Sequence, residues 1–474
     1  MKAPSQSAFI IYLTAFAACI LGALVFSHSA LLPGNMASMH IDSQVYIYTA
    51  QQILNGKVLY RDVFDHKGPV MYLFECIGVF FSNNNFSGLW YLQWLVFVSG
   101  IIPLFIFWAK KYNPILSLTA LLFMISWIFR TKTIGDNLPE IYVISLIALF
   151  YYLCLKMKEG EKDNRLYQML SGMCSMGLFL IKPNFIILIL PCMIWLFYFF
   201  STEKKHFKFL ISYTIGCCIV LLPFVVYFAY HHALGDACFA FWKFNFSYIS
   251  NQKLSVATSI YEALFKSPNY LLIFIVLASA VKFFFLKNDK STVLLLYITL
   301  ASSLIILIGY PGRGADSVHY AIPLAPLAAW FVIYIGQGFF KLQLVILLII
   351  SLYFSKPVFI HLFSKKQNSE VLNENVIFIN KHKKPDETLC ILGNHSSFYR
   401  QTGLRCNTSF FYTYPLMQSC NSEINRTFAD QFKKNKADWV LRENQYEFDT
   451  CITNILIDYK LVSSNKDGQL FHLN

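Results

Sequence analysis

The sequence predicts an α-helical polytopic membrane protein that ends in a small α/β domain. Of its 474 residues, 56% are hydrophobic and only 14% are charged, whereas soluble globular chains contain roughly 45–50% apolar and about 25% charged residues. Aromatic residues reach 17%, as expected for lipid-facing surfaces and interfacial belts. The net charge of +13 fits basic cytoplasmic loops. This composition excludes a water-soluble enzyme, a disordered chain, a collagen and a nucleic-acid-binding protein.

Candidate membrane spans follow from the apolar runs, because a spanning helix requires about 20 mostly apolar residues. Eleven segments come close to this length, at residues 8–30, 88–109, 113–129, 139–157, 167–182, 184–201, 208–231, 270–287, 291–310, 319–336 and 341–356. The first segment lacks a clear small-residue cleavage site, so we interpret it as a retained helix and not as a signal peptide.

A further apolar run at residues 69–82 decides the topology. If it is counted as a span, every later loop moves to the opposite side of the membrane. The run is short and contains Glu75. If it stays at the outer surface as an interfacial or re-entrant segment, five basic stretches lie in the cytoplasm. If it crosses, they lie outside, against the positive-inside rule. We therefore expect about eleven spans, a cytoplasmic N-terminus and an external C-terminus.

The last part of the chain differs in composition from the rest. Residues 357–474 are polar and contain short β-type runs such as "TLCILG" and "DWVL" between turn residues, so we expect residues 1–356 to form a transmembrane domain and 357–474 an external α/β domain. Two alternatives remain open for its four cysteines. They form two disulfides, with three possible connectivities, or they stay as four reduced thiols. These cysteines are Cys390, Cys406, Cys420 and Cys451.

The first outer loop concentrates the ionisable residues. Asp42 and Ser43 can cap an amphipathic helix that ends at Asn55-Gly56, and such a helix would lie at the outer membrane surface. The stretch "LYRDVFDHKGP" follows, directly before an apolar run, where charged side chains are expensive and usually functional. The charged residues of this stretch are Arg61, Asp62, Asp65, His66 and Lys67.

The loop resembles that of a known superfamily. An early Asp followed by G-x-x-x-Y-R-D-x-x-D-x-K-G-P is similar to the GT-C integral membrane glycosyltransferases, in particular the bacterial branch of protein mannosyltransferases and lipid A aminoarabinose transferases. Further short matches are "GDNLPEIY" at 135–142, "FLIKPNF" at 179–185 and "GRGADSVHYAIPLAPL" at 312–327. The resemblance covers most of the chain and implies a GT-C-like transmembrane domain, with interfacial helices in the first loop.

The resemblance assigns roles to two residues of the loop. Asp42 matches the early loop acid, which implies a general base that takes the proton of the acceptor hydroxyl; the alternative is a helix cap. Lys67 matches a lysine near the donor phosphate, where a cation would stabilise the developing charge of the leaving group; the alternative is a snorkelling lysine. Arg61, Asp62, Asp65 and His66 are candidates for binding sugar or acceptor, for positioning Lys67, or for holding a divalent metal, although the spacing is not compelling for a metal site.

Other candidates lie further along the chain. Asp136 is a candidate second catalytic carboxylate and Glu140 a sugar or acceptor ligand, because both occupy an outer loop that contributes to the site in the superfamily; an ordinary capping role is the alternative for Asp136. Lys182, Arg313 and His319 are candidate ligands of the donor phosphate, since basic groups at outer turns suit this anion. No required cofactor is evident.

The expected function is therefore transfer of one hexose or pentose, with inversion, from an undecaprenyl-phosphate-linked donor. The acceptor would be a glycan or lipid, most simply O-antigen or lipopolysaccharide, at the periplasmic face of a bacterial inner membrane. The alternatives are an O-antigen polymerase or ligase, whose largest loop normally comes late, and a flippase for lipid-linked sugars, which predicts internal repeats that this sequence lacks.

Overall fold

The computed structural model describes residues 6–27, 29–32, 39, 41–82, 85–129, 137–245, 298–301, 321–337, 373–413, 422–445, 450–466 and 468–474, with single residues between 349 and 356. The chain divides into two compact units. We call the first the helical unit; it comprises Met1–Leu32, Leu89–Phe224 and Lys253–Lys366. We call the second the loop–tail unit; it comprises Pro33–Gly88, Val225–Gln252 and Gln367–Asn474.

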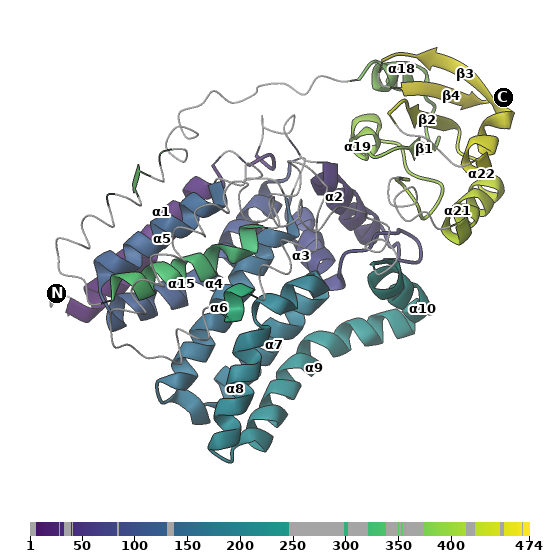
Figure 1. Ribbon diagram of the computed structural model, residues 1–474. Coiled ribbons are helices and arrows are strands. Elements are labelled where there is room, and N and C mark those ends of the chain that lie inside the picture. The colour runs from purple at the N-terminus through teal and green to yellow at the C-terminus, as the bar shows by residue number, and fades with distance from the viewer. Residues whose placement is uncertain are drawn as a thin grey trace. The chain divides into compact units, whose positions relative to one another are not determined.

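The helical unit is built from apolar helices, several of which run side by side in Figure 1. Its described elements, with α4 and α9 mostly inside it, are α1 Gln6–Val25, α4 Ser87–Lys111, α5 Pro114–Phe129, α6 Pro139–Lys158, η2 Glu161–Asp163, α7 Arg165–Ile181, η3 Pro183–Leu188, α8 Leu190–Thr202, α9 His206–Tyr230 and α15 Ala325–Gly336. Among the described residues, α4, α6 and α9 are long and apolar enough to span a membrane. In the most apolar 18-residue stretch of α9, only 11% is buried, which fits a helix that faces lipid.

Six predicted spans coincide with helices to within a few residues: 8–30, 88–109, 113–129, 139–157, 167–182 and 208–231. The predicted span 184–201 is instead the 3-10 helix η3 followed by α8. Pro183 begins η3 and Pro191 lies in the first turn of α8, and proline interrupts a continuous helix. The segments 270–287 and 341–356, and most of 291–310, lie outside the described residues. The total of eleven spans and their orientation stay predictions.

Helices α7 and α9 approach each other unusually closely. A Cβ atom at Gly172 would lie 2.0 Å from the carbonyl oxygen of Tyr213, and one at Gly216 would lie 1.9 Å from that of Met169. Only glycine fits at either position, and small residues of this kind allow apolar helices to pack backbone against backbone.

The loop–tail unit begins with the helices of the first loop. Its described elements before residue 250 are α2 Ile41–Leu54, α3 Pro69–Phe80, α10 Leu234–Cys238 and η4 Phe239–Phe244. The predicted helix after Asp42 is confirmed as α2, and it ends next to Gly56, whose φ of +86° is a conformation that glycine adopts easily. Helix α3 has 12 residues, about 18 Å at 1.5 Å per residue. That is too short to cross a hydrocarbon core of about 30 Å. The length of α3 therefore fits the predicted interfacial or re-entrant segment.

The tail carries the predicted α/β fold, with the runs "TLCILG" and "DWVL" in strands. Its elements are α18 Glu374–His382, β1 Leu389–Leu392, α19 Ser397–Thr402, α21 Ser422–Lys434, β2 Trp439–Glu443, α22 Thr450–Thr453, η6 Asn454–Asp458, β3 Tyr459–Ser464 and β4 Gly468–Leu473. The four strands have the order β1-β2-β4-β3. Strands β1 and β2 are parallel and the other pairs are antiparallel. The sheet carries helices around it in Figure 1.

The alternative prediction that all four tail cysteines form disulfides is wrong. Cys390 and Cys406 are free thiols in the described part of the chain. Cys390 is completely buried in β1, where it packs as a small apolar side chain. The Sγ of Cys406 lies 3.6 Å from the hydroxyl of Thr408. Cys420 and the side chain of Cys451 lie outside the described residues.

Candidate functional site

Asp65 is the centre of a buried cluster in the loop between α2 and α3. Its side chain is only 1% exposed. Its Oδ1 accepts a hydrogen bond from the hydroxyl of Tyr412 at 2.7 Å, and its Oδ2 accepts one from the hydroxyl of Tyr72. The backbone N–H of Lys67 adds a longer hydrogen bond of 3.4 Å. A buried carboxylate is costly unless hydrogen bonds replace its hydration, and these donors supply that replacement.

His66 joins Asp65 to Lys67. Its Nδ1 lies 3.2 Å from Oδ1 of Asp65, and its Nε2 lies 2.8 Å from the Nζ of Lys67. The ammonium group can only donate, so Nε2 accepts and the ring is the neutral tautomer with its proton on Nδ1, the nitrogen beside Asp65. The Nζ of Lys67 also lies 5.8 Å from the centre of the Tyr46 ring. We call Asp65, His66, Lys67, Tyr72 and Tyr412 the Asp65 cluster.

The pKa shifts agree with these protonation states. Burial alone would raise the pKa of Asp65, but the neighbouring His66 and Lys67 and the hydrogen bond from Tyr72 outweigh it, so the pKa lies well below its usual value. Burial and the charge of Lys67 lower the pKa of His66, against the opposing carboxylates of Asp65 and Asp42. At neutral pH the cluster therefore contains a carboxylate and a neutral imidazole beside Lys67.

The backbone around the cluster is held in a strained conformation. Tyr60 is buried and has a φ of +71°, which is rare for a residue with a bulky side chain. Its hydroxyl donates a hydrogen bond of 2.7 Å to the carbonyl of Lys67, and its ring packs against Phe228 with centroids 5.3 Å apart. Asn245 donates a 2.9 Å hydrogen bond to the carbonyl of His66. Strain of this kind persists only where surrounding contacts fix the chain.

Asp42 belongs to the same neighbourhood. It lies in the first turn of α2 and is half-buried, so it is a helical residue and not the residue before the helix. Its charge is among those that act on the pKa of His66. The loop–tail unit thus brings four predicted site residues together, namely Asp42, Asp65, His66 and Lys67.

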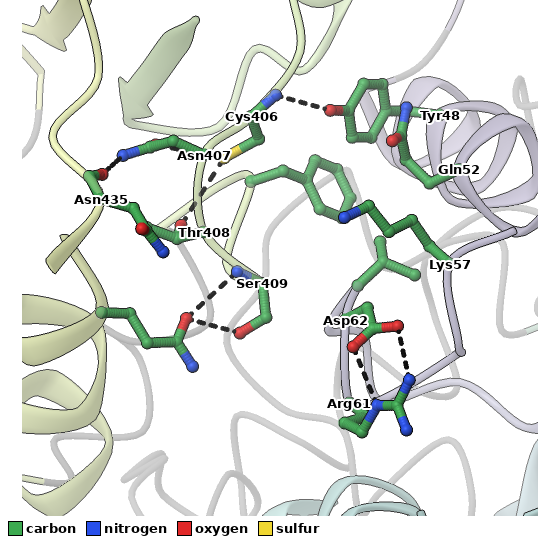
Figure 2. Close-up of a pocket in the computed structure, with 13 residues that line it drawn as sticks. Tyr48, Gln52, Lys57, Arg61, Asp62, Cys406, Asn407, Thr408, Ser409 and Asn435 are labelled. Carbon is green, nitrogen blue, oxygen red and sulfur yellow. Dashed lines mark hydrogen bonds and ion pairs between the residues drawn. The ribbon is translucent and has the colours of Figure 1, made fainter. Parts of the chain in front are cut away.

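Arg61 and Asp62 point to a different place. Arg61 donates to both carboxylate oxygens of Asp62, at 2.9 and 3.0 Å, and to the carbonyl of His231 at 2.7 Å. The hydrogen bonds from Arg61 lower the pKa of Asp62 more than burial raises it. Both side chains line a cavity of about 220 Å³ whose other wall comes from the tail (Figure 2).

A buried ion pair occupies the helical unit. The Nζ of Lys182, between α7 and η3, lies 2.7 Å from Oε1 of Glu140 in the first turn of α6, and the two side chains are 11% and 0% exposed. Nearby, Gln93 donates a hydrogen bond to the side chain of Asn137. The structure therefore joins two predicted site residues directly. Three further predicted site residues lie outside the described residues, namely Asp136, Arg313 and His319.

The fold agrees with two solved structures at low sequence identity. ArnT from Cupriavidus metallidurans, solved bound to undecaprenyl phosphate, aligns over 97% of this chain and 97% of its own length, with a TM-score of 0.62 and 10% identity. The Archaeoglobus fulgidus oligosaccharyltransferase in complex with zinc and sulfate aligns over 92% of this chain and 68% of its own length, with a TM-score of 0.54 and 15% identity. The chain has the GT-C fold. No protein-family model and no curated protein sequence matches it.

Three tyrosines that contact the first loop were missed by the sequence reasoning. Tyr60 stands inside the recognised motif, so its position was a usable signal. Tyr72 lies in an apolar helix, where a tyrosine is an ordinary core residue, and its hydroxyl gave no signal. Tyr412 lies 347 positions from Asp65, and no local pattern indicates a contact over that separation.

The predicted metal ligands are not gathered in the described part of the chain. No group of three or more His, Cys, Asp or Glu side chains there could hold a metal ion. Asp62 pairs with Arg61 at the cavity, while Asp65 and His66 face each other in the buried cluster. The described residues of the loop are thus arranged for hydrogen bonding and charge pairing.

Proposed function

We propose that the protein transfers one sugar from an undecaprenyl-phosphate-linked donor to a glycan or lipid acceptor on the outer face of a bacterial inner membrane. O-antigen or lipopolysaccharide is the proposed acceptor class. The observation that carries the proposal is the Lys67–His66–Asp65 arrangement beside Asp42, in a loop of a GT-C fold. The binding of undecaprenyl phosphate by the structurally similar ArnT supports the donor class.

Lys67 would hold the donor phosphate. When the bond between the anomeric carbon and the phosphate oxygen breaks, the electron pair leaves with the phosphate, and a nearby cation stabilises the added charge. The neutral ring of His66 accepts a hydrogen bond from this ammonium group, which holds it in place without competing for the phosphate. Asp65 fixes the ring in turn.

Asp42 would act as the general base. It would accept the proton of the acceptor hydroxyl while that oxygen attacks the anomeric carbon. A single displacement of this kind inverts the configuration of the sugar, and the products are the new glycoside and undecaprenyl phosphate. In the helical unit, Lys182 would be a further phosphate ligand. Glu140, which pairs with its ammonium group, would keep its proposed role in binding the sugar or acceptor. Asp136, Arg313 and His319 keep their proposed catalytic and phosphate-binding roles.

Two substitutions test the two roles in the full-length protein in lipid nanodiscs. Asp42→Asn removes the base and should reduce turnover by about 10²–10⁴-fold while binding of undecaprenyl phosphate stays normal. Lys67→Ala should weaken binding and turnover together, because a cation beside a phosphate acts in both the ground state and the transition state. Lys433→Ala, at the end of α21, is the control. Near-normal turnover of Asp42→Asn would leave Asp42 as a structural residue of α2 and contradict the proposal.

The class of reaction is tested by mass spectrometry of surface glycans from cells with and without the gene. A transferase predicts a mass increment of one sugar on the acceptor. A polymerase or ligase predicts a change in chain length or attachment, and a flippase predicts loss of a whole glycan without a new linkage; either result would overturn the proposal.

A further inference from the structure

The cavity beside Arg61 and Asp62 is separate in its residues from the Asp65 cluster. One wall comes from α2 and the loop after it, and the other comes from the tail, as Figure 2 shows. The lining side chains are Tyr48, Gln52, Lys57, Arg61, Asp62, Val63, Cys406, Asn407, Thr408, Ser409, Phe411, Gln431 and Asn435. Most of these side chains are polar, so this hollow would hold a ligand that forms many hydrogen bonds.

The two walls are fixed to each other by direct contacts. The backbone N–H of Cys406 donates a 3.0 Å hydrogen bond to the hydroxyl of Tyr48, and that ring stacks on Tyr399 with centroids 4.5 Å apart. The N–H of Phe64 donates to the carbonyl of Ser409 at 2.8 Å. A cavity whose walls are already in place loses little conformational freedom when a ligand binds.

Several polar groups on the walls are available to a ligand. The side-chain oxygen of Gln431 accepts hydrogen bonds from the N–H and hydroxyl of Ser409, at 3.1 and 2.9 Å. Its side-chain amide nitrogen can therefore donate to a ligand. Among the residues drawn in Figure 2, the side chains of Gln52, Lys57 and Asn435 form no hydrogen bond or ion pair. Both walls therefore present donors, and the amides of Gln52 and Asn435 present acceptors as well.

The charge in the cavity selects the class of ligand. Arg61 and Asp62 neutralise each other, and Lys57 is the remaining cation of the lining. An anionic ligand would face the carboxylate of Asp62, and an apolar ligand would cover the side-chain amides of the lining without pairing them, which is costly. Sugar hydroxyls both donate and accept, so they match this mixture of carboxylate, guanidinium and amides. Pockets for drug-sized ligands have roughly 300–1,000 Å³, so about 220 Å³ suits a single sugar ring.

We propose that this cavity binds an uncharged sugar of the acceptor glycan, outside the reacting centre, and so makes the tail a determinant of acceptor choice. The inference rests on the proposed transferase function. It predicts that substitutions on opposite walls, Gln52→Ala on α2 and Asn435→Ala on the tail, impair the same step. Each removes hydrogen bonds worth roughly 0.5–1.5 kcal/mol, or up to about tenfold in affinity.

The test uses the full-length protein in nanodiscs, with lipopolysaccharide purified from a strain that lacks the gene as the acceptor. Each substitution should raise the KM for this acceptor about three- to tenfold, and the KM for the undecaprenyl-phosphate sugar should change less than twofold. Lys433→Gln is the control, because Lys433 is an exposed tail lysine outside the lining. Saturation-transfer NMR with the oligosaccharide released from the same lipopolysaccharide gives a second readout without donor, and its signal should weaken in both variants.

The outcomes separate the two proposals. If the wild-type protein transfers sugar and both variants behave like Lys433→Gln, the cavity inference fails and the transferase function stands. If the variants raise the KM for the donor instead, the cavity does not bind acceptor and the inference also fails. If no transfer occurs but the oligosaccharide signal depends on Gln52 and Asn435, the cavity binds sugar and the transferase function fails.

Discussion

Asp62 and Asp65 stand three positions apart in one loop, yet they occupy opposite kinds of environment. The side chain of Asp65 is 1% exposed and is held by two tyrosine hydroxyls and His66. The side chain of Asp62 is 28% exposed and pairs with Arg61, which is 41% exposed. One carboxylate builds a closed cluster, and the other lines an open cavity. The difference follows from what surrounds each side chain, because the residue type is the same.

The comparison indicates different uses for the two sites. A closed cluster loses much when one member is removed, because the remaining polar groups stay buried without partners. An exposed ion pair contributes little to stability, and its charges remain accessible to a ligand. We therefore expect the Asp65 cluster to hold a reactive geometry and the cavity to recognise a substrate.

The largest effect is expected when the buried carboxylate is removed. Asp65→Ala leaves the hydroxyls of Tyr72 and Tyr412 without their acceptor and should cost about 3–5 kcal/mol of unfolding free energy. Asp62→Ala is the matched substitution in the same loop and should cost about 1 kcal/mol or less. Denaturant unfolding of the detergent-solubilised protein measures both. Equal losses would show that the two environments do not differ in energy as they do in exposure.

A smaller effect is expected when one hydrogen bond of the cluster is removed. Tyr412→Phe deletes a donor to Asp65, so this carboxylate interacts more strongly with His66 and raises the pKa of that imidazole. A protonated His66 can no longer accept the hydrogen bond of Lys67. The acid limb of the pH–rate profile should therefore move to higher pH.

The control for this substitution is Tyr399→Phe. The hydroxyl of Tyr399 donates to the carbonyl of Phe411 at 2.6 Å and does not touch Asp65. Its removal should cost about 0.5–1.5 kcal/mol of stability and leave the acid limb unchanged. A shift of the limb in both variants would mean that loosening of the tail, and not the bond to Asp65, controls the profile.

The smallest effect is expected in the pH dependence of stability. The pKa of His66 is lowered in the folded state, so the unfolded chain binds the proton more tightly. The stabilising contribution is complete above the unfolded value of about 6.5 and declines as the pH falls below it, by at most about 1.4 kcal/mol per pH unit. The lowered pKa of Asp65 acts only below the unfolded value of about 3.9. Between pH 7 and 5 the wild type should lose more stability than His66→Gln; parallel losses would contradict the assignment.

The sequence predicted those parts of the molecule that depend on local patterns. Helix α2, the short helix α3 and strands β1 and β2 follow from the spacing of apolar and turn residues over a few positions. Asp65, His66 and Lys67 are consecutive in the sequence, so their closeness could be predicted without knowledge of the fold. The contact between Tyr412 and Asp65 and the pairing of Lys182 with Glu140 depend on packing between distant segments. Composition and periodicity carry no information about such contacts. The break between η3 and α8, next to Pro191, was missed because hydropathy does not register the geometry of proline.

The long separation between Asp65 and Tyr412 has a consequence for biosynthesis. The ribosome adds about 5–20 residues per second, so the first loop emerges roughly 20–70 s before the residue 347 positions later that donates to its carboxylate. During this interval Asp65 lacks the hydrogen bond from Tyr412, although His66, Lys67 and Tyr72 have already been made. The Asp65 cluster is therefore complete only after Tyr412 has been made, and a message truncated before codon 412 would encode every charged residue of the loop but not the finished cluster.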